Sequence, residues 1–593
     1  MLLNTLDWSI LFAFFAVSIF IGIYTSRSNQ SASDYFVGGG KMPWWLLGIS
    51  MVATTFSTDT PNLVTDIVRQ NGIAGNWSWW AFLLTGMLTV FVYARLWKKS
   101  KILTDNEFYE IRYSGKAATI LRGFRAIYLG LFFNVMIMAT VSLAAIKIGG
   151  VLLGLSPLQT ILIAGTITVI YSSLGGLKGV LITDFIQFFM AIGGSILAAV
   201  YSLNHPKVGG LANLIANENV ASKLDFTPSM NDPKQFAVLL LVPLLVQWWS
   251  VWYPGAEPGG GGYIVQRMFA AKDESNAVKS VLFFNVVHYA LRPWPWIIVA
   301  LCSIVVYPDI QSLKDAFPNA ASIAKDDLAY SAMLTFLPHG VLGIIVTSLI
   351  AAYMSTISTH LNWGSSYLVL DVYKRFIKPE SSEKELMNVG KISTVVLMIL
   401  AMLIALVLEN ALQSFNILLQ IGAGTGLLFI LRWFWWRINA SAEIAAMASS
   451  FTIAIILELL LPKMDILMSS ETKLLIGVGT TTLVWILTAL LTKPSDEDVL
   501  INFVKKVKPG GPGWKKVREI AVAKGIDVDL IEDKQWKIPY GIACMIFGVV
   551  LVYSFLFGTG HILFNNVSTG LIYLAVSAVS VLALSKYYPK VLD

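Results

Sequence analysis

The chain has 593 residues, of which 56% are hydrophobic and only 13% carry a charged side chain. Soluble domains contain about 25% charged residues, so this composition excludes a soluble protein and predicts a chain that crosses a membrane many times. The net charge of +7 does not imply a nucleic-acid partner, because basic residues of membrane proteins gather on cytoplasmic loops.

Long apolar segments recur along the chain, and about 20 apolar residues suffice for one helix to cross a bilayer. Taken in order, they predict an all-α polytopic membrane protein with about 15 transmembrane helices. The segments are 7–26, 44–67, 76–97, 123–151, 157–174, 177–203, 236–256, 278–307, 339–371, 391–408, 411–436, 440–461, 473–492, 538–558 and 563–585. An odd number of spans places the two termini on opposite sides of the membrane.

The basic residues predict the orientation in the membrane. Lys and Arg cluster at 97–101, 371–378 and 504–518, and such clusters mark cytoplasmic loops. We therefore expect a multi-pass protein of the plasma (inner) membrane, with its N-terminus outside, its C-terminus in the cytoplasm and a cytoplasmic loop near 493–536. The lipid bilayer is its expected surrounding, and no obligatory protein partner is indicated.

The sequence lacks the motifs of soluble catalytic modules. It has no GxxxxGK[ST] motif of an ATP-driven pump, no HExxH zinc motif and no cluster of Cys and His. We therefore expect neither an enzyme nor an organic cofactor. Polar groups inside the apolar segments are the functional candidates, because they are expensive in a bilayer.

The first polar group is ATTFSTDTP at 53–61, inside an apolar segment. Pro61 cannot donate a backbone hydrogen bond, and the hydroxyls around it favour a helix that is interrupted here. Unwound carbonyls at such a break can bind a cation, and the half-helix ends can face a solute. The alternative is a proline kink whose Ser and Thr bond to their own helix, which gives Asp59 no role.

A second interruption is expected at 246–267, VQWWSVWYPGAEPGGGGYIVQR, because its prolines and consecutive glycines disfavour a continuous helix. Two interrupted segments in corresponding halves of a chain are the best sequence pointer to a transporter's binding site. The alternative is an ordinary loop between helices, with its tryptophans in an interfacial aromatic belt.

Two ionisable residues lie alone in apolar surroundings. Asp184 lies too deep in its predicted helix for an N-cap, and it could serve a bound cation, a proton relay or a salt bridge. Arg292 could pair with Asp59 or Glu257, hold a carboxylate of a solute, or reach the membrane interface. The residues alone leave these alternatives open.

The segment AAYMSTISTH at 351–360 combines hydroxyls with small residues. Ala352, Ser355, Thr356 and Thr359 share one helix face by their spacing. Hydroxyls, and a carbonyl freed at a small residue, are hard oxygen ligands that suit Na⁺. The alternative is close packing of small residues between helices.

Several longer patterns resemble the sodium/solute symporter family, which includes sodium–glucose, sodium–proline and sodium–sialic acid carriers. They are SDYFVGGGKMPWW (33–45), YSSLGGLKGVLITDFIQ (171–187), YIVQRMFAAKDESNA (263–277), AAYMSTISTHLN and LVLDVYKRF within 351–376, and IGAGTGLLFILRWFWWRINA (421–440). The resemblance implies a LeuT-type fold, in which five plus five helices form an inverted repeat. It implies one transporter domain over 1–593, with an extra helix at 7–26, the ten-helix core at 42–437 and accessory helices at 438–593.

The resemblance also implies Na⁺ as the coupling ion and a set of ligands for it. One site would use backbone oxygens of Ala53 and Phe56, the carbonyl of Ala352 and the hydroxyls of Ser355 and Thr356. A second site, like that of the sialic acid carriers, would use Asp184, Ser355, Ser358 and Thr359.

The solute site departs from the familiar family members. Trp79 stands where sugar carriers place a glutamate, and Thr55 stands where proline carriers place an aspartate, so neither glucose nor proline is supported. The candidate residues of the substrate cavity are Thr55, Ser57, Asp59, Trp79, Trp252, Tyr253 and Glu257. Tyr253 is the candidate for an aromatic inner gate.

Together these features predict a Na⁺-coupled symporter that imports a small polar organic solute by alternating access, with two Na⁺ sites. Two rival hypotheses are a non-transporting nutrient sensor on the same fold and a proton-coupled carrier with Asp184 as its relay. The sensor would need an output module or a partner, and the soluble part of this chain is only the loop near 493–536.

Overall fold

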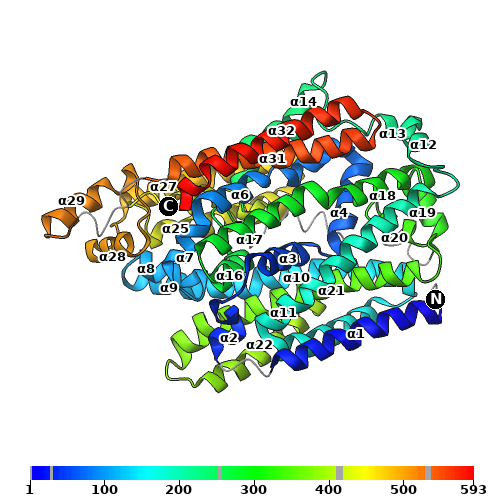
Figure 1. Ribbon diagram of the computed structural model, residues 1–593. Coiled ribbons are helices and arrows are strands. Elements are labelled where there is room, and N and C mark those ends of the chain that lie inside the picture. Colours follow the sequence, from blue (N-terminus) through cyan, green and yellow to red (C-terminus); the bar gives the residue numbers. More distant parts are fainter. Residues whose placement is uncertain are drawn as a thin grey trace.

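The structure is a computed structural model that describes residues 3–26, 31–251, 257–318, 321, 324–408, 419–527 and 536–592. This part of the chain is helical and contains no β-strand, and its long helices run along one common direction (Figure 1). Eleven segments in it are long and apolar enough to cross a membrane, and two shorter apolar helices accompany them. The all-α architecture is confirmed, whereas the count of about 15 spans stays a prediction.

The helices α3 (Trp44–Thr55) and α4 (Asp59–Asn71) are the two halves of the first interrupted segment. The helix α3 is capped by Phe56, whose ψ of 70° leaves the helical region. Pro61 falls in the first turn of α4, where a backbone N–H would have no intrahelical partner in any case. The interruption at 53–61 is therefore confirmed, and it lies just before the proline.

The second interruption separates the short helix η8 (Gln247–Trp249) from α16 (Gly262–Ala270). The chain leaves η8 in an extended conformation at Ser250, with ψ of 155°. Before α16, Gly259 and Gly260 have φ of 87° and 86°, a region that residues with a Cβ rarely adopt. These glycines permit the turn into α16, and the predicted interruption is confirmed.

Two long helices, α11 (Pro157–Leu203) and α21 (Val341–Ser366), pack against each other inside the bundle (Figure 1). The predicted boundary between the spans 157–174 and 177–203 appears inside α11 as a break at Gly176, with φ of 57° and ψ of −164°. The helix α3 packs on both α11 and α21. This arrangement brings the break after α3 next to the polar residues of the two long helices.

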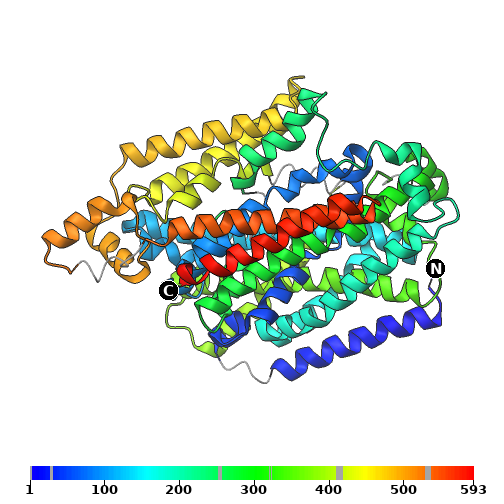
Figure 2. The same cartoon turned by 45° about the horizontal axis from the view of Figure 1, so that its top comes forward.

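Further long helices surround this core. They are α1 (Thr5–Ser26), α22 (Glu383–Ala405), α25 (Ala440–Ile455), α27 (Ser470–Leu491), α31 (Ile538–Leu563) and α32 (Val567–Tyr587). The helix α1 packs on α11, and α31 packs on α32 and on α6 (Leu83–Leu88). Figure 2 shows α31 and α32 crossing the front of the bundle while α1 lies along its lower edge.

In the described part of the loop near 493–536, the helices α28 (Glu497–Val507) and α29 (Lys515–Ala523) project from one end of the bundle (Figure 1). The C-terminus lies toward the same end, and the N-terminus lies at the opposite end. Which end faces the cytoplasm stays a prediction.

Candidate functional site

The break after α3 is held by the polar face of α21. The hydroxyl of Thr356 donates to the carbonyl oxygen of Thr54 at 2.7 Å and to that of Ala352 at 3.1 Å. On the far side of the break, the hydroxyl of Thr58 donates to the carbonyl oxygen of Leu349 at 3.2 Å. The face of α21 that the residue spacing predicts therefore contacts both sides of the interruption.

Two of the residues expected at the first Na⁺ site, Thr356 and Ala352, take part in these hydrogen bonds. Ala53 and Phe56 lie at the end of α3, where the last carbonyls of a helix lack partners farther along the helix. The N–H of Phe56 reaches back to the carbonyl of Ala53 at 3.2 Å. Ser355 differs from the other candidates because its hydroxyl donates to the Asp184 carboxylate, at 2.7 Å.

The Asp184 carboxylate lies at the centre of a second polar cluster and is fully buried. It accepts hydrogen bonds from Ser355 and from Ser50, the latter at 2.5 Å. Thr359 is linked to Ser50 through Arg267, which donates to both hydroxyls, and the hydroxyl of Thr359 also lies 3.0 Å from that of Thr54. The hydroxyl of Ser358 instead donates to the carbonyl of Ser355, at 3.1 Å. Three of the four residues expected at the second Na⁺ site thus contribute side-chain oxygens to one cluster.

Arg267, on α16, completes this cluster, although the sequence analysis did not assign it a role. Its Nη2 donates to the hydroxyl of Thr359 at 2.8 Å and to that of Ser50 at 3.2 Å. The same nitrogen lies 3.9 Å from the carboxylate of Asp184. A signal was present in YIVQR, since an arginine in an apolar helix directly after an interruption needs a buried partner.

A cavity of about 140 Å³ lies beside the break. Five of the residues predicted for the substrate cavity line it, and their role toward a solute stays a prediction: Thr55, Ser57, Asp59, Trp79 and Glu257. Trp252 and Tyr253 lie outside the described residues. Further lining residues from neighbouring helices are Thr85, Tyr263, Asn285, His288, Tyr289 and Arg292.

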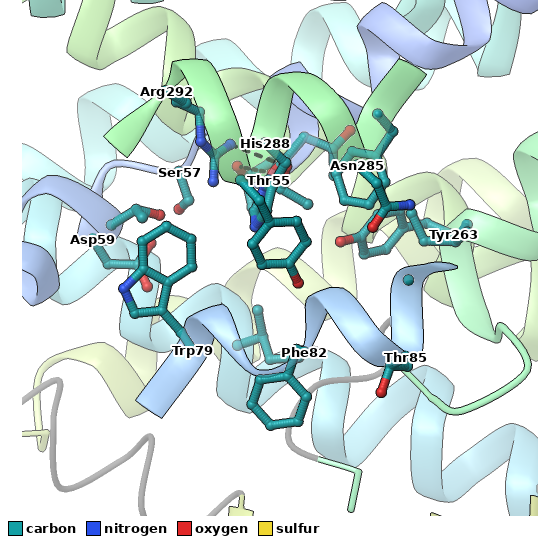
Figure 3. Close-up of a pocket in the computed structure, with 18 of the residues that line it drawn as sticks. Thr55, Ser57, Asp59, Trp79, Phe82, Thr85, Tyr263, Asn285, His288 and Arg292 are labelled. Atoms are coloured by element: carbon teal, nitrogen blue, oxygen red, sulfur yellow. Dashed lines mark hydrogen bonds between the residues drawn. The ribbon is translucent and has the colours of Figure 1, made fainter. Parts of the chain in front are cut away.

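One side of this cavity is charged, because Arg292, Ser57 and Asp59 lie next to one another there (Figure 3). Arg292 is only 1% exposed, so it does not reach the membrane interface. Its Nη1 donates to the carbonyl of Val52 at 3.2 Å and to the hydroxyl of Thr55 at 3.1 Å. Within the described part of the chain it forms no ion pair with Asp59 or Glu257. Its burial excludes the interface alternative, and contact with a solute carboxylate stays a prediction.

Aromatic rings form another part of the wall. The ring of Trp79 stacks on that of Tyr289, with centroids 5.8 Å apart and an interplanar angle of 23°. Its Nε1 donates to the side chain of Asn76 at 2.8 Å, which fixes the orientation of the indole. His288 lies edge-on to Trp79 and 3.2 Å from the hydroxyl of Thr55. These contacts fix the orientation of the aromatic rings that line this part of the cavity.

Glu257 lines the cavity, but its carboxylate is held by a residue behind the wall. Arg125, on α9 (Gly115–Ile127), donates from Nη2 to the two carboxylate oxygens at 2.9 and 3.2 Å. Both side chains are 2% exposed. The guanidinium of Arg125 also stacks near Phe429, 4.9 Å from its ring centroid. The ion pair of Glu257 with Arg125 therefore connects the second interrupted segment to α9.

Comparisons with known proteins agree on one group. The model of the sodium:solute symporter family matches residues 35–450. The chain is 27% identical to a sodium/glucose cotransporter of Vibrio parahaemolyticus, over 84% of this chain and 92% of that protein. It is 26% identical to the sodium/sialic acid symporter SiaT of Proteus mirabilis, over 75% of this chain and 88% of that protein.

A solved structure shares the arrangement of helices. It is the substrate-bound, outward-open state of a Na⁺-coupled sialic acid symporter, which aligns with a TM-score of 0.64 at 22% identity. The alignment covers 83% of this chain and 99% of that one. At this identity the likeness concerns the fold alone.

Proposed function

Because the chain belongs to the sodium:solute symporter family, we propose that it imports a small polar organic solute by coupling it to the inward movement of Na⁺. Its similarity to a sodium/glucose cotransporter and to a sodium/sialic acid symporter supports this class of activity. The solute and Na⁺ would move by alternating access, in which the central cavity opens to one side of the membrane at a time.

The observation that carries the proposal is the contact between Thr356 of α21 and the interrupted end of α3, at 2.7 Å. Broken helices expose backbone oxygens that coordinate Na⁺ in transporters of this kind. The first Na⁺ would bind the carbonyls of Ala53, Phe56 and Ala352 and the hydroxyls of Ser355 and Thr356. Since the same break lines the cavity through Thr55, ion and solute would bind to adjacent parts of one segment.

The second Na⁺ would bind at Asp184 with Ser355, Ser358 and Thr359. Arg267 already lies beside Asp184 and donates to Thr359. Na⁺ binding there therefore requires the guanidinium to give up its bond with Thr359, and Ser355 to be shared between the two sites. This competition links occupancy of the second site to the position of α16, which carries Arg267.

The membrane potential provides adequate energy for accumulation. Each positive charge that crosses 100 mV releases about 2.3 kcal/mol. Two Na⁺ ions release about twice as much, and since about 1.4 kcal/mol corresponds to a tenfold ratio, a solute gradient beyond a thousandfold is accessible. The expected location is the plasma (inner) membrane, with the basic loop near 493–536 in the cytoplasm.

Uptake in liposomes tests this function against its rivals. The purified protein is reconstituted, and labelled solute is followed under an imposed Na⁺ gradient and, separately, under an imposed pH gradient. Symport with Na⁺ predicts accumulation in the first condition only. Accumulation driven only by the pH gradient would show a proton-coupled carrier. Solute binding without accumulation in either condition would favour a sensor.

A further inference from the structure

Arg292 lines the cavity, and two of its guanidinium nitrogens form no hydrogen bond within the described chain. Two bonds from Nη1 of Arg292, to Val52 and Thr55, anchor the guanidinium. Its Nε and Nη2 are buried, and neither has a hydrogen-bond partner among the described residues. Buried polar groups are nearly always paired in native proteins, so this edge is a place where an acceptor from outside the chain, such as a solute carboxylate, can bind.

The position of this edge is fixed by packing. The guanidinium carbon of Arg292 lies 5.0 Å from the ring centroid of Trp296 and 5.4 Å from that of Phe56. The two rings contact each other edge to face, with centroids 5.0 Å apart. The two rings and the two bonds from Nη1 hold the guanidinium in this orientation. Nε and Nη2 are two parallel donors, the arrangement that a carboxylate accepts in a bidentate pair.

A hydrogen-bond acceptor without a partner, on Asp59, lies on the same side of the cavity. The Oδ1 atom of Asp59 is buried without a hydrogen-bond partner in the described chain, and Figure 3 shows Asp59 and Ser57 beside Arg292. A solute with a carboxylate alone would pair Arg292 and leave this oxygen unpaired. A donor group next to the carboxylate would satisfy Asp59 as well, which avoids the penalty of a buried unpaired acceptor.

We infer that the transported solute is a small carboxylic acid with a donor group next to the carboxylate, as in an α-amino or α-hydroxy acid. Its carboxylate binds Nε and Nη2 of Arg292, and its ammonium or hydroxyl group binds Asp59. The rest of the solute lies against Trp79 and Tyr289, whose rings form the facing aromatic wall. The inference rests on the proposed function, because it names the solute of the same cavity.

Thermal stabilisation of the purified full-length protein, with and without Na⁺, measures binding of defined probes. The panel contains α-amino acids, the corresponding α-hydroxy acids, N-acetylneuraminate, D-glucose and myo-inositol. Each acid that stabilises the protein is compared with its uncharged amide. We expect Na⁺-dependent stabilisation by one or more of the acids and none by their amides. Preference for the amino or the hydroxy series identifies the group that Asp59 accepts.

Variants of the two charged residues localise the effect. Arg292→Gln should weaken binding of the acid roughly 10- to 100-fold, because it removes charge-assisted hydrogen bonds. Arg292→Lys keeps the charge but loses the two parallel N–H donors, so its affinity for the acid should lie between those of the unaltered protein and Arg292→Gln. Asp59→Asn should reduce the preference for solutes with an ammonium or hydroxyl group next to the carboxylate. The carboxylate itself should still be required for binding. Arg375→Gln, at an arginine whose side chain is 45% exposed, is the matched control and should bind like the unaltered protein.

Stabilisation by Na⁺ alone shows that each variant is folded. It also distinguishes failure of this inference from failure of the proposed function. If Na⁺ stabilises the protein but its solutes are uncharged sugars or polyols, or no acid binds, the inference is wrong and the symporter function stands. The inference is equally wrong if folded Arg292→Gln and Arg292→Lys bind the acid unchanged. If Na⁺ affects neither stability nor binding, the proposed function itself fails.

Discussion

The guanidinium of Arg267 lies 3.9 Å from the carboxylate of Asp184, and both side chains are fully buried. The two residues come from different parts of the chain, α16 directly after the second interruption and α11. Burial of either charge alone is unfavourable, so each stabilises the other in the absence of a bound ion. The pair also shares Thr359 and Ser355 with the proposed second Na⁺ site.

Asp184→Asn should lower the cooperativity of Na⁺ binding while some binding at the first site remains. The substitution removes the only carboxylate among the expected ligands and takes away the buried negative charge beside Arg267, so the melting temperature should also fall. Stabilisation as a function of Na⁺ concentration measures both effects. An unchanged slope and midpoint of the Na⁺ dependence would exclude the second site.

Thr356→Val should weaken Na⁺ binding about tenfold, since it replaces the hydroxyl that joins α21 to the break after α3 with a methyl group of similar size. Na⁺ titration by thermal stabilisation measures the change. Thr347→Val is the matched control on the same helix, because among the described residues the Thr347 hydroxyl bonds to the carbonyl of Gly343 alone, at 2.6 Å. Equal Na⁺ affinities for the two variants would contradict the proposed first site.

Glu257→Gln should destabilise the protein strongly. It breaks a buried ion pair and leaves the Arg125 charge without its partner, a change that typically costs about 3–5 kcal/mol. The melting temperature in detergent measures this loss. Glu497→Gln, which affects an exposed contact with Lys524, should change it little. If Glu257→Gln instead leaves the melting temperature unchanged and abolishes solute binding, Glu257 binds the solute and its ion pair with Arg125 does not stabilise the fold.

Gly86→Ala should change solute binding without changing Na⁺ binding. A Cβ at Gly86 would overlap with the side-chain amide of Asn285, and both residues line the cavity. The amide must therefore move into or away from the solute space. Gly479→Ala is the control, because a Cβ there meets no atom within 4 Å. Solute affinity that is equal in the two variants would show that the solute does not reach Asn285.

Several features of the candidate site follow from local sequence. The interruption at 53–61 depends on hydroxyls and a proline within one segment, and the second interruption depends on Gly259 and Gly260, whose positive φ the structure shows. The polar face of α21 follows from helical spacing. These predictions succeeded because backbone preference and periodicity act over a few residues.

The partners of the charged residues could not be predicted in the same way. Glu257 was predicted for the substrate cavity and lines it, but its ion pair with Arg125, which lies 132 positions earlier, has no local signal in the sequence. Arg292 had four open alternatives, of which its burial excludes the membrane interface, while Glu257 pairs with Arg125 instead. Such pairings depend on how distant helices approach in space, and no local pattern encodes them.

The sequence by itself determined the class of protein, the two broken helices, the hydroxyl face of α21 and the resemblance to sodium/solute symporters. Only the tertiary structure decided that Arg267 accompanies Asp184 and that the Nε and Nη2 edge of Arg292 is left free beside Asp59. The physical reason is that burial makes an unpaired charge costly. Whether a charge is paired by the protein or left for a ligand is settled only when all the helices are packed.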